Sequence, residues 1–190
     1  MADYEVSGAY VDAVLRSLKS SEHFETIKGQ LTPPVLEMVN NPWSETWHPA
    51  LHLEAVGNAA IAAIGAAAFE ELAYAAVRDR FGAIVMPMLK STLASTNRSP
   101  AAVLSKLESV VKVAMRGLDI MWQPDSPAAG AAAPNSGLLQ VRYPRPVAAH
   151  VEGSWRGVLR YVFEVTQATG RIERSRHSPA GNTLQYLVSW

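Results

Sequence analysis

Two histidines, His48 and His52, stand four residues apart and could share one face of a helix. Such pairs occur in metal sites, because the neutral imidazole ring binds zinc and other transition metals. The zinc-protease signature, however, has glutamate directly after the first histidine, and Pro49 stands at that place here. We therefore predict no metal site, keep His48 and His52 as metal candidates, and interpret the segment as packing at the start of a helix.

Four arginines in the last third of the chain could bind an anion. By helix and strand periodicity they form two pairs, Arg156 with Arg160 and Arg174 with Arg176, each on one face of its element. Guanidinium groups bind phosphate and carboxylate through paired hydrogen bonds. Residues 137–190 hold seven arginines against three glutamates, a net charge of +4. The pattern indicates a ligand or anion site, with solvation of the outer faces as the alternative.

The known catalytic motifs are missing from the sequence. It has no Gly-x-Ser-x-Gly elbow, no Walker loop and no Gly-x-Gly-x-x-Gly fingerprint. The adjacent Glu70 and Glu71 point to different sides of a helix, so they do not form an acid–base pair across a cleft. Cysteine is absent, which excludes disulfides, thiol nucleophiles and thiolate metal sites. We expect a non-enzymatic protein, with a hydrolase of unrecognised type as the last alternative.

Composition also limits the partners. Seventeen basic and seventeen acidic residues cancel, so no overall field attracts nucleic acid or an anionic membrane. The longest apolar stretch, residues 59–69, is too short to span a bilayer. The first residues lack the apolar core of a signal peptide. We expect a cytoplasmic protein without a membrane span.

Helical periodicity fills the first two-thirds of the chain. Gly65 predicts a break within this part, Ser99-Pro100 is a helix start signal, and Gly117 is a helix stop. Apolar side chains recur three and four positions apart over residues 10–31, 49–82 and 100–114.

After residue 117 the apolar period changes to two, which predicts strands. The alternating segments are residues 118–122, 139–143, 172–176 and 184–190. Between the two pairs, Pro146 opens a helix with one apolar stripe, and Gly170 has the position of its C-cap. The connection over about 123–137 is rich in Pro, Ala, Gly and Ser, so we expect a mobile loop there.

These elements predict a single α+β domain over residues 1–190. A helical array over about 1–117 precedes a β-β-α-β-β unit over about 118–190, whose strands form a four-stranded antiparallel sheet. Within its helix, Gly153 and Gly157 lie one turn apart, although each glycine costs roughly 0.5–1 kcal/mol relative to alanine. Close packing against a helix, strand or ligand is expected to offset that cost.

Several segments resemble a known group of domains. They are the N-terminal helical array, Trp47-His48-Pro49 at the start of a helix, the helix from Val147 to Thr169, and the closing strand Leu187-Val188-Ser189-Trp190. Together they resemble a poorly characterised myxobacterial family, related in architecture to haem-NO-binding, vinyl-reductase-like and TRAPP-subunit domains. The resemblance implies an α+β ligand-binding or protein-docking module, often dimeric.

The haem-binding branch of that group uses a proximal histidine and a Tyr-x-Ser-x-Arg motif for the propionates. The nearest string here, Tyr143-Pro144-Arg145-Pro146, lacks the serine and the arginine spacing, and His150 matches no family position. We therefore expect no cofactor. The leading hypothesis is a sensory or scaffolding domain that holds an apolar small molecule or a protein partner between its helices and sheet, with a homodimer as one expected assembly. The alternative is a sensor of gases or of redox state. It would bind haem or a metal ion through His48, His52 or His150.

Overall fold

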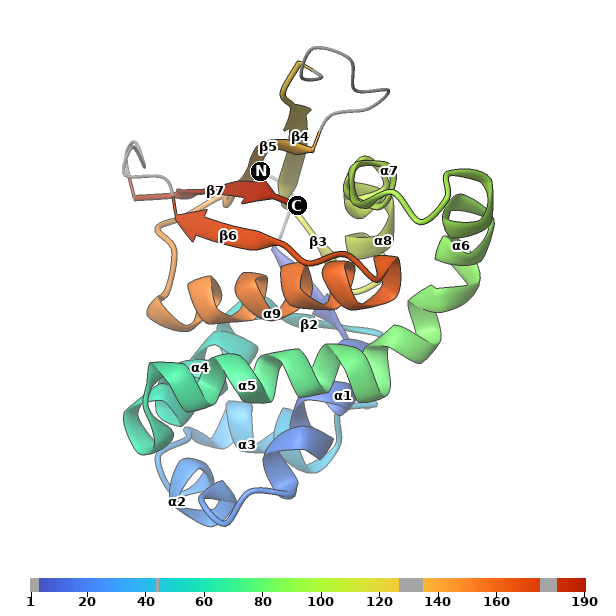
Figure 1. Ribbon diagram of the computed structural model, residues 1–190. Coiled ribbons are helices and arrows are strands. Elements are labelled where there is room, and N and C mark those ends of the chain that lie inside the picture. Colours follow the sequence, from blue (N-terminus) through green and yellow to red (C-terminus); the bar gives the residue numbers. More distant parts are fainter. Residues whose placement is uncertain (1–3, 44, 127–134, 175–180) are drawn as a thin grey trace.

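The structure is a computed structural model that describes residues 4–43, 45–126, 135–174 and 181–190. Helices come first along the chain and strands dominate its last third, which confirms the predicted α+β class (Figure 1). The helices of the first part are α1 (Gly8–Lys19), α2 (Phe24–Lys28), α3 (Pro33–Asn40), α4 (Ala50–Ile64), α5 (Ala66–Ala76), the π-helical turn η1 (Val77–Phe81), α6 (Gly82–Ser95), α7 (Pro100–Leu104) and α8 (Leu107–Val111).

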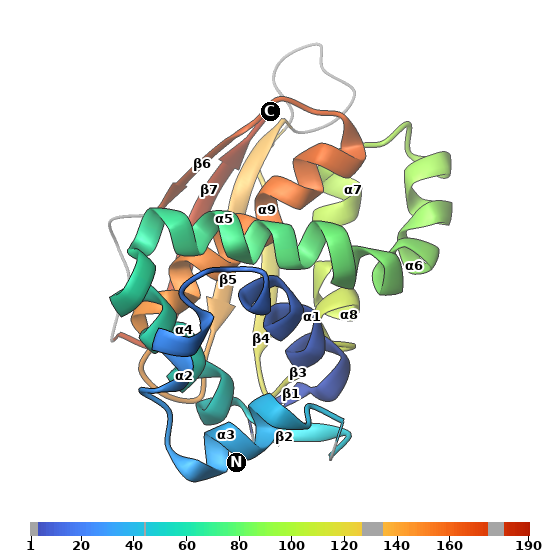
Figure 2. The same cartoon turned by 90° about the horizontal axis from the view of Figure 1, so that it is seen from below.

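Local signals explain where these helices begin and end. The Ser7 hydroxyl caps α1 by accepting a hydrogen bond from the Tyr10 backbone N–H at 3.3 Å. Gly65 separates α4 from α5 with a φ of 80°, which glycine adopts without steric cost. From there α5, η1 and α6 follow one another directly, and α6 lies at the edge of the molecule beside α7 (Figure 2).

The large sheet contains β4 (Asp119–Pro124), β5 (Ser136–Arg142), β6 (Arg171–Arg174) and β7 (Thr183–Ser189). All its pairings are antiparallel, as predicted, and the strand order is β4-β5-β7-β6. The helix between the two hairpins, α9 (Ala149–Thr166), lies against one face of the sheet (Figure 1). There Leu139, Val141 and Tyr186 are fully buried, and the Tyr186 hydroxyl donates to the Glu152 carbonyl of α9 at 3.1 Å.

A second, three-stranded sheet was not predicted. Its strands are β1 (Glu5–Ser7), β2 (Trp47–Pro49) and β3 (Met115–Arg116), in the order β2-β1-β3. Strands this short show no readable alternation. Tertiary contacts hold them instead, because Arg116 pairs with Glu5 at 2.5 Å and stacks over the Trp47 ring at 4.4 Å.

Three predicted boundaries differ from the structure. The helix expected to stop at Gly117 ends earlier, at Val111, because the chain enters strand β3 at Met115. Strands continue to Pro124 and resume at Ser136, so only part of the loop expected over 123–137 is irregular, and residues 127–134 lie outside the described part of the chain. Helix α9 ends at Thr166, before Gly170, because Gln167 takes the left-handed conformation with a φ of 59°. Among the described residues, no helix is both long and apolar enough to cross a bilayer.

Candidate functional site

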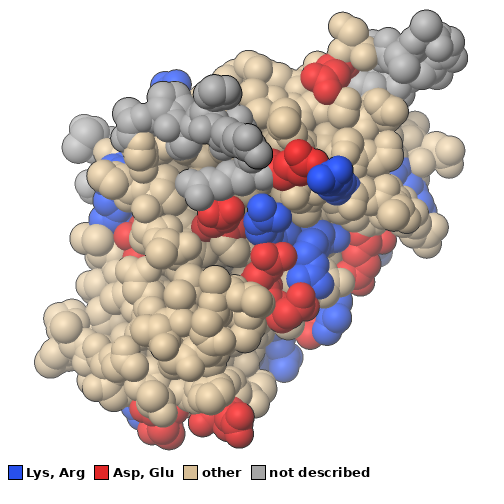
Figure 3. Space-filling view, turned by 60° about the vertical axis from the view of Figure 1, so that its left-hand side comes forward, with Lys and Arg blue, Asp and Glu red and all other residues tan. Residues whose placement is uncertain are grey.

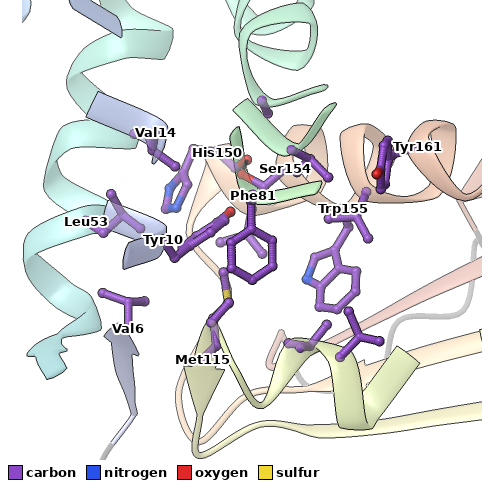
Figure 4. A pocket seen from close by; sticks show the side chains of 18 of the residues that line it. Val6, Tyr10, Val14, Leu53, Phe81, Met115, His150, Ser154, Trp155 and Tyr161 are labelled. Atoms are coloured by element: carbon purple, nitrogen blue, oxygen red, sulfur yellow. Dashed lines mark hydrogen bonds between the residues drawn. The ribbon is translucent and has the colours of Figure 1, made fainter. Parts of the chain in front are cut away.

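An apolar cavity of about 90 Å³ lies where α1, α4, α5 and η1 meet α9. Tyr10 and Phe81 form part of its wall, with their rings edge to face at 5.3 Å (Figure 4). Apolar side chains make up most of the lining, and its few polar groups include His150, Ser154, Glu54 and hydroxyls of tyrosine. A cavity of this kind favours an apolar ligand that a small number of polar groups orient.

His150 is the histidine of this cavity, and it lies in the first turn of α9. Its Nδ1–H donates to the Asn58 side-chain oxygen on α4 at 3.3 Å, and the Nε2 lone pair has no hydrogen-bond donor among the described residues. Burial lowers the pKa of His150 to about 4, so the ring is neutral at pH 7. Gly57 makes room for it, since a Cβ there would lie 2.5 Å from the imidazole. This arrangement resembles that of metal-binding histidines, whose second nitrogen is held by an acceptor.

Tyr143 and Trp155 fix the opposite wall. The Trp155 Nε1–H donates to the Tyr143 hydroxyl at 2.5 Å, and both side chains are buried. Burial holds the pKa of Tyr143 well above its usual value, so the phenol stays protonated. The bond between these two side chains fixes the position of the indole within the lining.

A partly buried ion pair lies beside the cavity. Arg145 Nη2 is 3.0 Å from Glu54 Oε1, and the guanidinium lies 5.3 Å from the centre of the Tyr4 ring. Both Glu54 and Tyr4 line the cavity. Burial raises the pKa of Glu54, and Arg145 counteracts this rise. Arg145 Nη2 is taken up by Glu54, whereas Arg145 Nε has no hydrogen-bond acceptor among the described residues.

The structure does not place His48 and His52 on one helix. His48 belongs to β2 and is 3% exposed, and its Nε2–H donates to the Pro42 carbonyl at 2.8 Å. His52 lies in α4. The described residues contain no group of three or more His, Asp or Glu side chains that could hold a metal ion.

The structure describes the side chains of two of the four candidate arginines, Arg156 and Arg160. Arg160 reaches α5 and binds both carboxylate oxygens of Glu71, at 2.6 and 3.1 Å, while Arg156 donates to the Ile172 carbonyl at 3.3 Å. Arg174 lies in β6, and Arg176 lies outside the described residues. Figure 3 shows basic and acidic side chains interleaved on one face of the molecule. Arg156 and Arg160 therefore bridge elements of the fold, and the anion site predicted for the four stays a prediction.

Gly153 and Gly157 lie where α9 crosses α5. A Cβ at Gly157 would stand 2.7 Å from the Tyr74 backbone nitrogen, and one at Gly153 would stand 3.2 Å from the Phe69 ring. The close neighbour of these glycines is thus a helix.

No protein-family model matches the chain, and no curated protein matches its sequence. Solved structures nevertheless share its fold. An Fe(II) unliganded H-NOX protein from K. algicida aligns with a TM-score of 0.61 and 12% identity, over 96% of this chain and 95% of its own. A structure from work on haem redox potential and porphyrin distortion aligns with a TM-score of 0.58 and 10% identity, over 97% of this chain and 99% of the other. An oxygen-binding H-NOX domain related to soluble guanylate cyclases, solved as its oxygen complex, aligns with a TM-score of 0.59 and 10% identity, over 96% and 94%.

These neighbours support the resemblance to haem-NO-binding domains at the level of the fold. They contradict the expectation of no cofactor, because one is an Fe(II) protein and another was determined in work on haem. That expectation depended on one short string at Tyr143, whereas a fold can hold a cofactor with other side chains. A protein partner and a homodimer stay predictions.

The sequence offered His150 only as one of three candidate histidines of a haem or metal sensor, and it singled out Arg145 for no site. The contact that orients His150 joins residues 92 positions apart in the chain. The available signal was a histidine in the first turn of the helix opened by Pro146. That signal gives no information about Asn58.

Proposed function

We propose that the protein is a non-enzymatic sensory domain whose ligand site is the apolar cavity, and that it senses through a haem bound by His150. The observation that carries this proposal is the state of His150: a neutral imidazole on the cavity wall, with Nδ1 held by Asn58 and Nε2 without a hydrogen-bond donor among the described residues. A neutral, oriented imidazole nitrogen is the ligand that haem iron takes from histidine.

The donor groups around the cavity fit a haem. His150 Nε2 supplies the iron ligand, the apolar lining suits the faces of the macrocycle, and Arg145, paired with Glu54 beside the cavity, offers one unmatched N–H donor, at Nε, to a carboxylate. When bound, the haem iron supplies the affinity for a diatomic gas. The shared fold with Fe(II) and haem proteins supports the same assignment.

The cavity must widen to take a haem. Its volume of about 90 Å³ is well below the roughly 300–1,000 Å³ of pockets for larger ligands. The side chains that would have to turn aside are the large ones of the lining, Tyr10, Phe81 and Trp155. Trp155 is bonded to Tyr143, so we expect Tyr10 and Phe81 to move first.

The test is titration of the purified protein with haem, followed by the Soret band. We expect a saturable low-spin or five-coordinate spectrum in the unmodified protein, its loss in His150→Ala, and no change in the matched control His52→Ala. Circular dichroism checks that both variants fold. An unchanged spectrum in His150→Ala would refute the assignment of the iron ligand, and failure of the unmodified protein to bind haem would refute the haem proposal as a whole.

The cavity volume favours one second candidate, a small apolar ligand held without rearrangement. Dry apolar cavities of about 150 Å³ bind benzene or xenon, and this cavity is of the same order at about 90 Å³. Native mass spectrometry of the purified protein distinguishes the two, because haem and a small apolar molecule differ greatly in mass. The same measurement reports whether the protein is a monomer or a homodimer.

A further inference from the structure

A second hollow, the α6–α9 groove, lies between α6 and the C-terminal half of α9. It has a volume of about 530 Å³, which is within the range of small-molecule sites. Its apolar surface comes from Met86, Leu93 and Val165, and its basic groups are Arg78, Lys90 and Arg98. It is a separate hollow from the cavity at His150, since Tyr161 and Val165 line both and form the wall between them.

The charges in the groove are unbalanced. Three cations face one carboxylate, Glu164, which already accepts a hydrogen bond from the Tyr74 hydroxyl. Arg78 is paired with Asp79 at 2.5 Å. Within the described part of the chain, Lys90 and Arg98 have no carboxylate within ion-pair distance. Two cations are therefore available to a ligand.

The backbone at the end of α6 places one of these cations. Asn97 and Arg98 both have positive φ angles, of 49° and 58°. Residues other than glycine adopt this left-handed backbone conformation at a steric cost. The Arg98 N–H donates to the Leu93 carbonyl at 2.9 Å and closes the helix. The chain thus turns sharply here, and Arg98 becomes part of the groove lining.

Tyr161 contributes a polar group at the inner wall. It is 7% exposed, and among the described residues its hydroxyl has no hydrogen-bond partner. Gly82, at the start of α6, makes room for it, because a Cβ there would lie 2.5 Å from the hydroxyl oxygen. A phenolic O–H without a partner can donate to an anion.

We propose that the α6–α9 groove binds an amphipathic anion, a carboxylate or phosphate group attached to an apolar chain. The head group contacts Lys90, Arg98 and the Tyr161 hydroxyl, and the chain lies along Met86, Leu93 and Val165. Arg98, just beyond the end of α6 at Ser95, would offset the dipole of that helix even without a ligand. A hollow with an apolar floor beside two unpaired cations is not needed for that role.

The test measures binding of decanoate and decyl phosphate to the haem-free protein by isothermal titration calorimetry at low salt. Decanol, with the same chain but no charge, and acetate, with the charge but no chain, are the ligand controls. We expect both anions to bind more tightly than either control, with affinity falling as salt rises. The ratio between decanoate and decyl phosphate shows whether the site prefers a carboxylate or a phosphate head.

Protein variants test the assignment of residues. The double variant Lys90→Glu, Arg98→Glu should bind decanoate at least about tenfold more weakly, because each charge-assisted hydrogen bond contributes about that factor. Lys28→Glu, on the distant α2, is the matched control and should bind as the unmodified protein does (Figure 1). Absence of binding, equal affinity for decanol, or unchanged affinity in the double variant would each overturn the proposal. The haem spectrum of the double variant should be unchanged, so this result and the haem result are independent.

Discussion

The backbones of α5 and α9 approach each other closely at Gly157, and this contact can be tested by adding one methyl group. In Gly157→Ala the new Cβ would lie 2.7 Å from the Tyr74 backbone nitrogen and 3.0 Å from the Ala73 carbonyl carbon. Both atoms belong to the backbone of α5, so they cannot turn aside as a side chain would. The two helices must separate locally, or α9 must shift against the sheet.

Two opposing effects set the expected change in the free energy of unfolding of Gly157→Ala. Overpacking a close-packed interior costs about 1–3 kcal/mol, and replacing glycine by alanine inside a helix returns roughly 0.5–1 kcal/mol. We therefore expect Gly157→Ala to lower the free energy of unfolding by about 1–2 kcal/mol. Gly153→Ala is the matched control, one turn away on the same helix, where the Cβ would meet the Phe69 ring at 3.2 Å. A ring can adjust, so this variant should stay within about 0.5 kcal/mol of the unmodified protein.

The assay is equilibrium unfolding in urea, monitored by circular dichroism. The slope of the free energy of unfolding against urea concentration is compared between the variants. A thermal scan gives a second measure, since 1 kcal/mol shifts the melting temperature of a chain of this size by about 2–4 °C. The reasoning is refuted if both variants change stability equally, or if Gly157→Ala is the more stable of the two. Either result would mean that α5 and α9 are not in backbone contact at Gly157.

Two further predictions concern the cavity wall. The pKa of His150 in the folded protein, about 4, lies below its value in the unfolded chain, so acid favours the unfolded state. The free energy of unfolding should fall by up to about 3 kcal/mol as the pH drops from about 6.5 to 4. Above that range His150 should have no effect on stability. Comparing the pH dependence of unfolding in His150→Gln isolates this loss, and an identical profile in the variant would contradict it. Tyr143→Phe removes the acceptor of the buried Trp155 N–H and should cost about 1–3 kcal/mol in urea unfolding. Tyr161→Phe, whose hydroxyl has no partner among the described residues, is the control, and an equal loss in both would argue against the Tyr143 hydrogen bond.

The functional conclusion changed once the tertiary structure was known, and the reason lies in the residues of the cavity. The sequence offered His48 and His52 as metal candidates, yet the His48 ring is bonded to the Pro42 carbonyl within a strand that no periodicity revealed. His150 matched no motif, yet it is the histidine that Asn58 orients in an apolar cavity. A motif compares positions along the chain, whereas a ligand site depends on positions in space.

The sequence by itself determined the class of the fold and most of its large elements. Strand alternation and the stripe of α9 follow from burial of one face, and Ser7, Gly65 and the Ser99-Pro100 pair set helix boundaries through local backbone chemistry. Such signals act within a few residues, which is why they can be seen in one dimension.

Tertiary structure alone decided which distant side chains meet. The small sheet joins segments around residues 6, 48 and 115, Arg145 meets Glu54, and the α6–α9 groove unites α6 with α9. These contacts form because burying the apolar stripes of several helices and one sheet together fixes how the elements pack. No periodicity within one element specifies the neighbour against which it packs, so the cavity, its histidine and the basic groove became visible only in three dimensions.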